Sequence, residues 1–505
     1  MTNFPWLTTL ALVPLVGAVV LALLPSAKAL LAKQVALAVS VIPVLMVIVM
    51  ALNFDANSTQ QFQFVESAAW IPSFGVNYAL GVDGISLVLI AMAVILVPLV
   101  IIAGWNDVEQ VGRGSAKEFF GLILVLETFM IGVFAATDVF LFYVLFEAIL
   151  IPVYFLIGRY GGPQRQYAAV KFLLYSLAGG LLMLAALIGM YVVTGTFDYT
   201  ELVGFDIDPS TQKLLFLGFF MAFAIKAPLV PFHTWLPDAA AQATPGTAVL
   251  LVGVLDKIGT FGMIRFLLPI FPDASSFFAP TIIVLSLVGI IYGALLAIGQ
   301  TDLKRLIAYT SVSHFGFISL GIWVFTMPGQ SGSGLYMVNH GFSTAALFLI
   351  GGYLIARRGS ARIEDFGGVH KVAPVLAGTF LVAGLSSLAL PGLSSFVSEF
   401  LVLQGAFMHN RWVGFVATLG IVLAALYILL MYKRTMTGPV ADGVKGFADL
   451  KTREVVAVAP VLAIIIALGV APQPVLDVVN PAIERVMDQI GASDPAPEVA
   501  EGTNQ

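Results

Sequence analysis

Four charged residues lie deep inside apolar runs that are long enough to cross a membrane. Glu147, Lys226, Lys257 and Glu399 each stand nine to twelve residues from one end of such a run. At the rise of an α-helix these positions are roughly 14–18 Å from the membrane surface, about halfway across. A charge there costs on the order of 2.5–3.5 kcal/mol, and the four together on the order of 10 kcal/mol before any pairing. We therefore predict that all four serve a function.

The types of these residues indicate which chemistry they perform. Removal from water favours the neutral form of a lysine, whereas a nearby carboxylate favours its charged form. Glu147 could thus decide whether Lys226 carries a proton, and such a pair would act as a proton switch. A fixed structural salt bridge between the two residues is the alternative interpretation.

Three histidines extend this chemistry, because imidazole titrates near physiological pH. His233, His314 and His340 fall at or near membrane depth and are candidate proton relays between the lysines. For His340, a role in packing is equally open. Metal binding by histidine is not indicated, because no two histidines have the spacing that chelation from one helix requires.

The composition shows which kind of molecule must position these groups. Of the 505 residues 59% are hydrophobic and only 10% are charged, whereas about a quarter are charged in soluble domains. An ordinary soluble enzyme is excluded. The net charge of −5 without a basic cluster argues against nucleic acid as a partner. Cysteine is absent, which excludes disulfides, thiolate zinc sites and cysteine-ligated iron–sulfur clusters in this chain.

A window of about 19 apolar residues predicts about fourteen transmembrane helices in an all-α polytopic membrane protein. They lie near residues 5–24, 32–53, 79–103, 119–136, 138–158, 171–194, 214–229, 247–268, 280–298, 303–325, 334–357, 374–409, 412–434 and 453–471. Lysine and arginine concentrate in alternate connections, so the positive-inside rule predicts that both termini lie outside. The acidic tail, residues 494–505, is predicted to be disordered.

The spacing of the predicted helices repeats. Thr137-Asp138 opens the fifth helix and Thr301-Asp302 the tenth, an offset of 164 residues. Five helices make one unit, and because five is odd the second unit must be inverted, as in many transporters. The predicted organisation is a three-helix segment, 1–118, a first five-helix repeat, 119–268, a second inverted repeat, 280–434, and a last helix with a tail, 435–505.

Two helices at matching places in the repeats contain prolines. Pro228 and Pro231 interrupt the seventh helix, and Pro391-Gly392 interrupts the twelfth. Proline removes a backbone hydrogen bond, so both helices are predicted to be broken. Freed carbonyl groups at membrane depth need polar partners, which favours breaks that line polar cavities over kinks that only shape packing.

Five segments of the chain carry recognisable motifs: Gly81–Ser86, Phe146-Glu147, Ala224–Asp238, the helix with Lys257, and Gln300–His314. They closely resemble a known family, the antiporter-like subunits of complex I, the respiratory NADH:quinone oxidoreductase. The resemblance covers nearly the whole chain, and Mrp-type cation/proton antiporters share it.

Within the family, Glu399 in the twelfth helix resembles the subunit M branch, the counterpart of mitochondrial subunit four, where other branches usually have lysine. The lack of a further C-terminal helix expected of subunit L agrees with this placement. The resemblance implies that Glu147, Lys226, Lys257 and Glu399 carry protons, with His233 and His314 on the polar axis that connects them. Asp256 departs from the family pattern. It is expected either to pair with Lys257 or to face another helix.

The resemblance also implies a partner set, and the alanine- and glycine-rich composition suggests a bacterial location. The chain would translocate protons in a bacterial cell membrane, beside other antiporter-like subunits and the lipid bilayer. It would hold no cofactor itself, with FMN, iron–sulfur clusters and quinone in partner subunits. Two alternatives remain open: a subunit of a Mrp-type cation/proton antiporter without redox coupling, and a passive membrane scaffold of a redox assembly.

Overall fold

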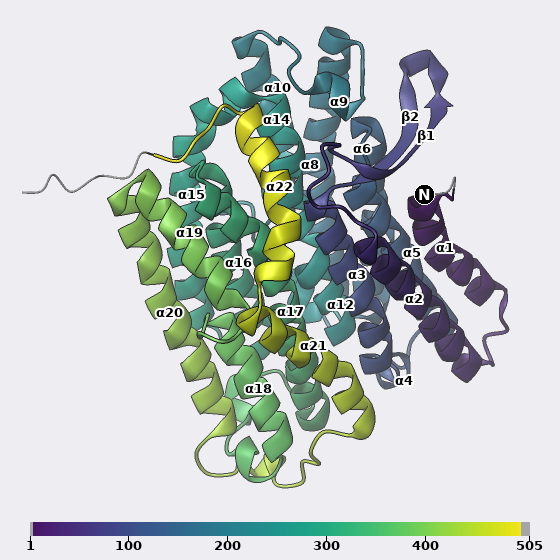
Figure 1. Cartoon of the computed structure of the whole chain (residues 1–505). Coiled ribbons are helices and arrows are strands. Elements are labelled where there is room, and N and C mark those ends of the chain that lie inside the picture. The colour runs from purple at the N-terminus through teal and green to yellow at the C-terminus, as the bar shows by residue number, and fades with distance from the viewer. Residues whose placement is uncertain (1–3, 496–505) are drawn as a thin grey trace, which may run out of the picture.

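The computed structural model describes residues 4–495 and shows a bundle of helices (Figure 1). Backbone groups in lipid must bond within their own segment, so long apolar runs become helices. The first part of the chain contains α1 (Trp6–Leu23), α2 (Ala29–Leu52), β1 (Gln63–Ile71), β2 (Val76–Val82), α3 (Gly84–Ala103), α4 (Asp107–Val111), α5 (Ala116–Ala135), α6 (Val139–Ala148), α7 (Leu150–Tyr160), α8 (Arg165–Thr194), α9 (Tyr199–Leu202), α10 (Pro209–Lys226) and α11 (Trp235–Gln242). The second part contains α12 (Pro245–Leu250), α13 (Lys257–Gly262), α14 (Leu268–Ile270), α15 (Pro272–Ile298), α16 (Leu303–Trp323), α17 (Met327–Arg358), α18 (Pro374–Ser387), α19 (Ser395–His409), α20 (Arg411–Met436), α21 (Thr452–Val470) and α22 (Gln473–Gln489).

Within residues 4–495, twelve helices are long and apolar enough to cross a membrane, or up to thirteen if a bent pair counts as one span. These twelve coincide with twelve of the fourteen predicted spans, which confirms a polytopic helical membrane protein. The two predicted spans outside this set are the seventh and the twelfth, near 214–229 and 374–409. Both were predicted to be broken. The total of fourteen stays a prediction.

The seventh helix is broken where the prolines predicted it. α10 ends at Lys226 and α11 begins at Trp235, with Pro228 and Pro231 between them. The indole Nε1 of Trp235 donates a hydrogen bond of 2.9 Å to the carbonyl of Ile225. A side chain thus satisfies a backbone group at the break.

The second half of this broken helix is held in place by charge. Asp238 in α11 accepts a hydrogen bond of 2.7 Å from Lys171 Nζ of α8. It also pairs with Arg305 of α16. Three elements far apart in the sequence therefore meet at one carboxylate.

The twelfth helix is also broken as predicted. α18 ends at Ser387 and α19 begins at Ser395. Asn339 of α17 donates a hydrogen bond of 2.5 Å to the carbonyl of Ser394. Ser343 of the same helix contacts the hydroxyl of Ser394 at 3.2 Å. The break is therefore lined by polar groups.

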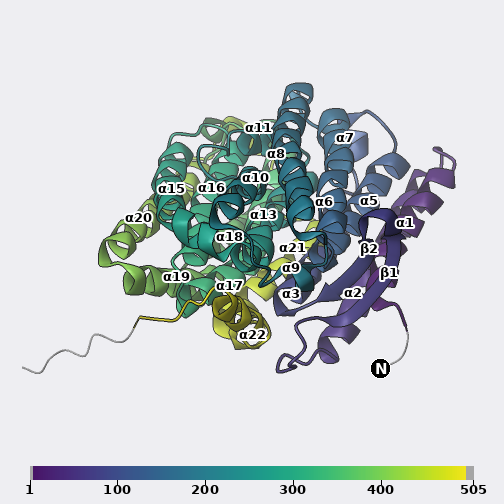
Figure 2. The same ribbon diagram turned by 90° about the horizontal axis from the view of Figure 1, so that it is seen from above.

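A third irregular helix was not predicted. The segment that carries Lys257 is interrupted on both sides of α13 by π-helical turns, Leu251–Leu255 and Met263–Leu267. Such turns occur often at functional sites. Every residue from Gly246 to Ile270 is buried, and Figure 2 shows α13 near the middle of the bundle. The span that carries Lys257 is thus both interrupted by π-helical turns and buried at the centre of the bundle.

Two further elements were absent from the sequence prediction. The strands β1 and β2 form an antiparallel hairpin at one end of the bundle. The helix α22 lies across α3 and α17, in the region predicted only as a tail. A Cβ at Gly84 of α3 would lie 1.7 Å from the carbonyl oxygen of Val478, so glycine permits this close approach. Most of the predicted tail, 496–505, lies outside the described residues.

Two short backbone bridges support the predicted repeat. Asp138 pairs with Asp198 before α6, and Asp302 pairs with Arg362 before α16, again with an offset of 164 residues. Each aspartate also caps the helix that follows it. The first bridge adjoins β2, because Thr137 donates to the carbonyl of Ala79. The two bridges lie at opposite ends of the bundle, which agrees with inversion.

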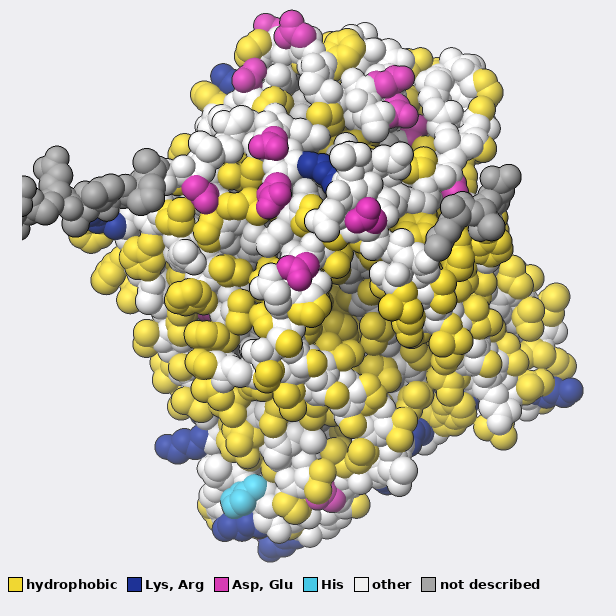
Figure 3. All heavy atoms as spheres, in the orientation of Figure 1, with side chains coloured by type: hydrophobic (Ala, Val, Ile, Leu, Met, Phe, Trp, Pro, Cys, Tyr) yellow, Lys and Arg dark blue, Asp and Glu magenta, His cyan; other side chains and the backbone are white. Residues whose placement is uncertain are grey.

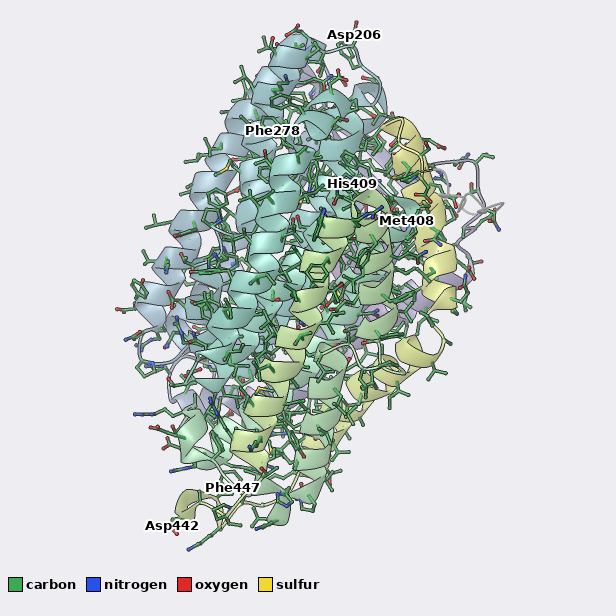
Figure 4. The ribbon with its side chains drawn as sticks, turned by 90° about the vertical axis from the view of Figure 1, so that its left-hand side faces the viewer. Asp206, Phe278, Met408, His409, Asp442 and Phe447 are labelled. Atoms are coloured by element: carbon green, nitrogen blue, oxygen red, sulfur yellow. The ribbon has the colours of Figure 1, made fainter. Side chains whose placement is uncertain are left out.

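Charge divides the two ends of the molecule. Acidic side chains gather on the end of the visible face that carries the β1–β2 hairpin, and basic side chains on the other (Figures 1 and 3). Asp206 lies at the acidic end and Asp442, in a loop between two basic segments, at the opposite one (Figure 4). By the positive-inside rule the latter end faces the cytoplasm.

This orientation can be tested by labelling, because the native chain has no cysteine. A Ser73→Cys variant, at the tip of the hairpin, should react with an impermeant maleimide from the outside. A Lys445→Cys variant, in the loop after α20, should react only after the membrane is opened. The reverse pattern would show that the assigned orientation is wrong.

Candidate functional site

The first part of the candidate site lies at the break in the seventh helix. Lys226 is the last residue of α10, and only 2% of it is exposed. The carboxyl end of a helix carries partial negative charge, which stabilises a cation there. Its Nζ lies 4.7 Å from the ring centroid of Phe146 and 5.9 Å from that of Phe172. Aromatic faces attract a cation without accepting its proton.

Glu147 lies on α6, next to Phe146, and is half-buried. Its carboxylate packs against Gly180 of α8, where a Cβ would lie 1.7 Å from Oε1. Glu147 and Lys226 interact electrostatically, yet within residues 4–495 no ion pair of 4.0 Å or less joins them. The carboxylate of Glu147 and the ammonium group of Lys226 are therefore close enough to interact but form no salt bridge. The alternative interpretation, a fixed structural salt bridge, does not match this structure.

Lys257, in contrast, is firmly bonded. Its Nζ donates to the carbonyl of Val252 at 2.6 Å and lies 2.7 Å from His340 Nδ1. When Lys257 carries its proton it donates and Nδ1 accepts, which places the His340 proton on Nε2. That nitrogen lies 3.1 Å from Ser311 Oγ and 3.2 Å from Thr344 Oγ1. His340 is thus the direct partner of Lys257 rather than only a packing residue.

Two tyrosines continue the line of polar groups toward α19. The rings of His340 and His314 have centroids 5.3 Å apart, and His314 Nε2 lies 3.0 Å from the hydroxyl of Tyr427. The ring of Tyr336 is 5.9 Å from that of His314. Its hydroxyl donates a hydrogen bond of 3.1 Å to Glu399 Oε2. Glu399 is 3% exposed.

His233 lies apart from this line. Its ring contacts Tyr292 and Tyr309, with centroids at 5.5 and 6.4 Å. Its Nδ1 is buried and has no hydrogen-bond partner. The structure therefore brings together four of the predicted residues in one chain of contacts, from Lys257 to Glu399, and leaves His233 beside the break that follows Lys226.

Sequence reasoning missed the hydroxyl groups of this line. Tyr336 lies four residues before His340 on α17, and Ser311 lies three before His314 on α16. Residues at these spacings share a helix face, so the spacing was a usable signal. Tyr427 has no such signal, because its contact depends on how α20 packs.

Broken membrane helices around buried acids, amines and imidazoles define a protein of the ion-transporter type. Residues 136–424 match the family model described as "NADH:quinone oxidoreductase/Mrp antiporter, TM". Residues 10–133 match "NADH-ubiquinone oxidoreductase chain 4, amino terminus".

Relatives and solved structures agree with these matches. NADH-quinone oxidoreductase subunit M of Mycobacterium tuberculosis is 52% identical over 99% of this chain and 97% of its own length. The subunit M of Rhodobacter capsulatus is 40% identical over 96% of this chain and 97% of its own length. A chain of respiratory complex I from Thermus thermophilus superimposes with a TM-score of 0.87 at 30% identity, over 96% of this chain and all of that one. A chain of the Mrp complex from Dietzia shares the fold, with a TM-score of 0.86 at 22% identity, over 97% and 98% of the two chains.

The chain belongs to the family of NADH:quinone oxidoreductase subunit M (chain 4) proteins, the antiporter-like membrane subunits of complex I. It is accordingly one subunit of an enzyme complex and sits among other membrane subunits. It is a multi-pass protein of a bacterial membrane.

The contact between Glu147 and Gly180 yields a prediction. A Gly180→Ala substitution must displace the carboxylate, and displacement of a reacting group by about 1 Å costs up to about a hundredfold in rate. We expect proton pumping, measured by dye quenching in inverted vesicles, to fall at least about tenfold. In the control, Gly121→Ala, the new Cβ meets nothing within 4 Å. Unchanged pumping in Gly180→Ala would contradict a positional role of Glu147.

Proposed function

We propose that this chain moves protons across the membrane and that quinone reduction elsewhere in complex I drives the movement. The proton carriers are Glu147, Lys226, Lys257 and Glu399. The observation that supports this best is the buried series of contacts from Lys257 through His340 and His314 toward Glu399.

The Glu147 and Lys226 pair acts as the input switch. Two opposite charges about 6 Å apart interact by about 3 kcal/mol at an effective dielectric constant near 20. That energy corresponds to about two pKa units. Because no bond fixes the pair, the approach or withdrawal of the carboxylate changes the charge of the lysine. Withdrawal of Glu147 therefore releases a proton from Lys226.

Lys257 and His340 form the transfer step that follows the input switch. A proton moves from Nζ of Lys257 to Nδ1 of His340, and the proton on Nε2 leaves toward Ser311 or Thr344. The imidazole ends neutral and the lysine ends as an amine, so charge is balanced. Beyond it, His314 and the tyrosines connect to Glu399, which is the last carboxylate of the line.

His233 serves as a relay on the Lys226 side, because it follows the same break and its Nδ1 has no partner. The two five-helix units, 119–268 and 280–434, each supply one broken helix and one buried lysine or glutamate beside it. No cofactor belongs to this chain in the proposal. FMN, iron–sulfur clusters and quinone reside in partner subunits.

The main competitor is a Mrp-type antiporter subunit with the same residues. The likeness to the Dietzia complex shows the fold alone, whereas identity of 52% along the whole length favours complex I. Purification through a tag on this chain should recover subunits with flavin and iron–sulfur absorbance. Recovery of an assembly without either chromophore would favour the antiporter.

The switch predicts how variants of Glu147 behave. Glu147→Gln should reduce quinone reduction and pumping together by tenfold or more, because Lys226 loses the group that holds its proton. Glu147→Asp should keep part of the activity, because it retains the charge and loses one methylene. A Glu147→Gln/Lys226→Met double variant should remain inactive. Normal pumping by that double variant would mean that the pair is only structural.

The end of the line gives a second prediction. Glu399→Gln should abolish most pumping in an assembled complex, because an amide keeps the shape and cannot carry the proton. Tyr336→Phe should have a smaller effect, about two- to tenfold, since it removes a single hydrogen bond of about 0.5–1.5 kcal/mol. The measurement is the number of protons pumped per NADH. Full stoichiometry in Glu399→Gln would reject the role of this carboxylate.

A further inference from the structure

Asp256 is a buried carboxylate that the proposed route does not use. It is completely buried, and neither of its oxygens has a hydrogen-bond partner. A buried carboxyl group without a hydrogen bond from the protein is costly. The chain retains it immediately before Lys257, at the centre of the bundle.

The side chains of Asp256 and Lys257 point toward different neighbouring elements. Lys257 bonds to Val252 and His340, so it has no bond to its neighbour in sequence. Adjacent helical residues point about 100° apart. The helix α13 packs against the end of α10 through Gly259, where a Cβ would lie 2.5 Å from the carbonyl oxygen of Phe223. Asp256 lies one turn before Gly259 and therefore faces the end of α10.

The end of α10 is where Lys226 lies. Asp256 interacts electrostatically with both Lys226 and Lys257. It is thus the one acidic group, within the described residues, that acts on both lysines.

We propose that Asp256 is a further proton carrier, which takes a proton from Lys226 and delivers it to Lys257. This inference rests on the proposed function. In the first step the ammonium of Lys226 becomes an amine and the carboxylate becomes an acid. In the second step the acid returns to a carboxylate and the amine of Lys257 becomes an ammonium. The flexible stem of Lys226, whose Nζ has no partner, provides the movement that the first step requires.

If Asp256 carries protons, its variants should lose pumping without losing stability. If Asp256 is only structural, its variants should lose both. Asp256→Leu and Asp256→Asn remove a buried carboxyl group whose oxygens have no hydrogen-bond partner, so the melting temperature of the purified complex should rise or stay equal. Pumping should nevertheless fall at least tenfold in both. Asp256→Glu should retain at least a third of the pumping activity of the unsubstituted complex. The control is Thr128→Val, a buried polar residue of α5 that bonds only to its own helix and should pump normally.

Two outcomes would overturn the role of Asp256. One is full pumping in Asp256→Asn. The other is a melting temperature that falls in parallel with pumping in both Asp256→Leu and Asp256→Asn, as a structural residue would give. Lys226→Met is measured alongside. If Lys226→Met is impaired while Asp256→Asn pumps normally, only this inference fails, whereas normal pumping by Lys226→Met removes the proposed function itself.

Discussion

The cost of placing charge and unbonded backbone inside a bilayer governs this molecule. Each buried ionisable group is unfavourable by several kcal/mol unless protein groups replace water. In this structure, helices are broken near the buried ionisable groups. Trp235 and Asn339 satisfy backbone carbonyls at the two proline breaks. The carbonyl of Val252, in a π-helical turn, accepts from Lys257 itself.

These same breaks explain why part of the site could be predicted from sequence. A charge in an apolar run is conspicuous, so Glu147, Lys226, Lys257 and Glu399 were found without knowledge of any contact. Proline also acts locally, since it cannot donate a backbone hydrogen bond. Proline alone does not suffice, because α1, α2 and α3 contain Pro14, Pro43 and Pro98 and stay continuous. The breaks in the seventh and twelfth helices were predicted from prolines that occupy matching places in the two repeats.

Contacts between helices were much less predictable. Membrane helices are apolar on every side, so no amphipathic pattern shows which face meets which neighbour. The bond between Lys257 and His340 joins residues 83 positions apart, and that between His314 and Tyr427 spans 113. The π-helical turns around α13 contain no proline and left no mark in the sequence pattern. The hairpin and α22 were missed because a search for long apolar runs overlooks extended and amphipathic segments.

The two halves of the line of titratable groups differ in kind. Glu147, Lys226 and Asp256 have electrostatic interactions but lack fixed partners, so small movements of one change the charge of another. Lys257 is bonded to His340 and Tyr336 to Glu399, whereas His340, His314 and Tyr336 meet through ring contacts, so these groups have fixed neighbours. In the proposed function, a unit that responds to charge precedes a unit that conducts protons, which is the arrangement of a gated relay. Coupling between subunits then requires only a change of field at Glu147, the half-buried member of the line, because every later group is enclosed within this chain.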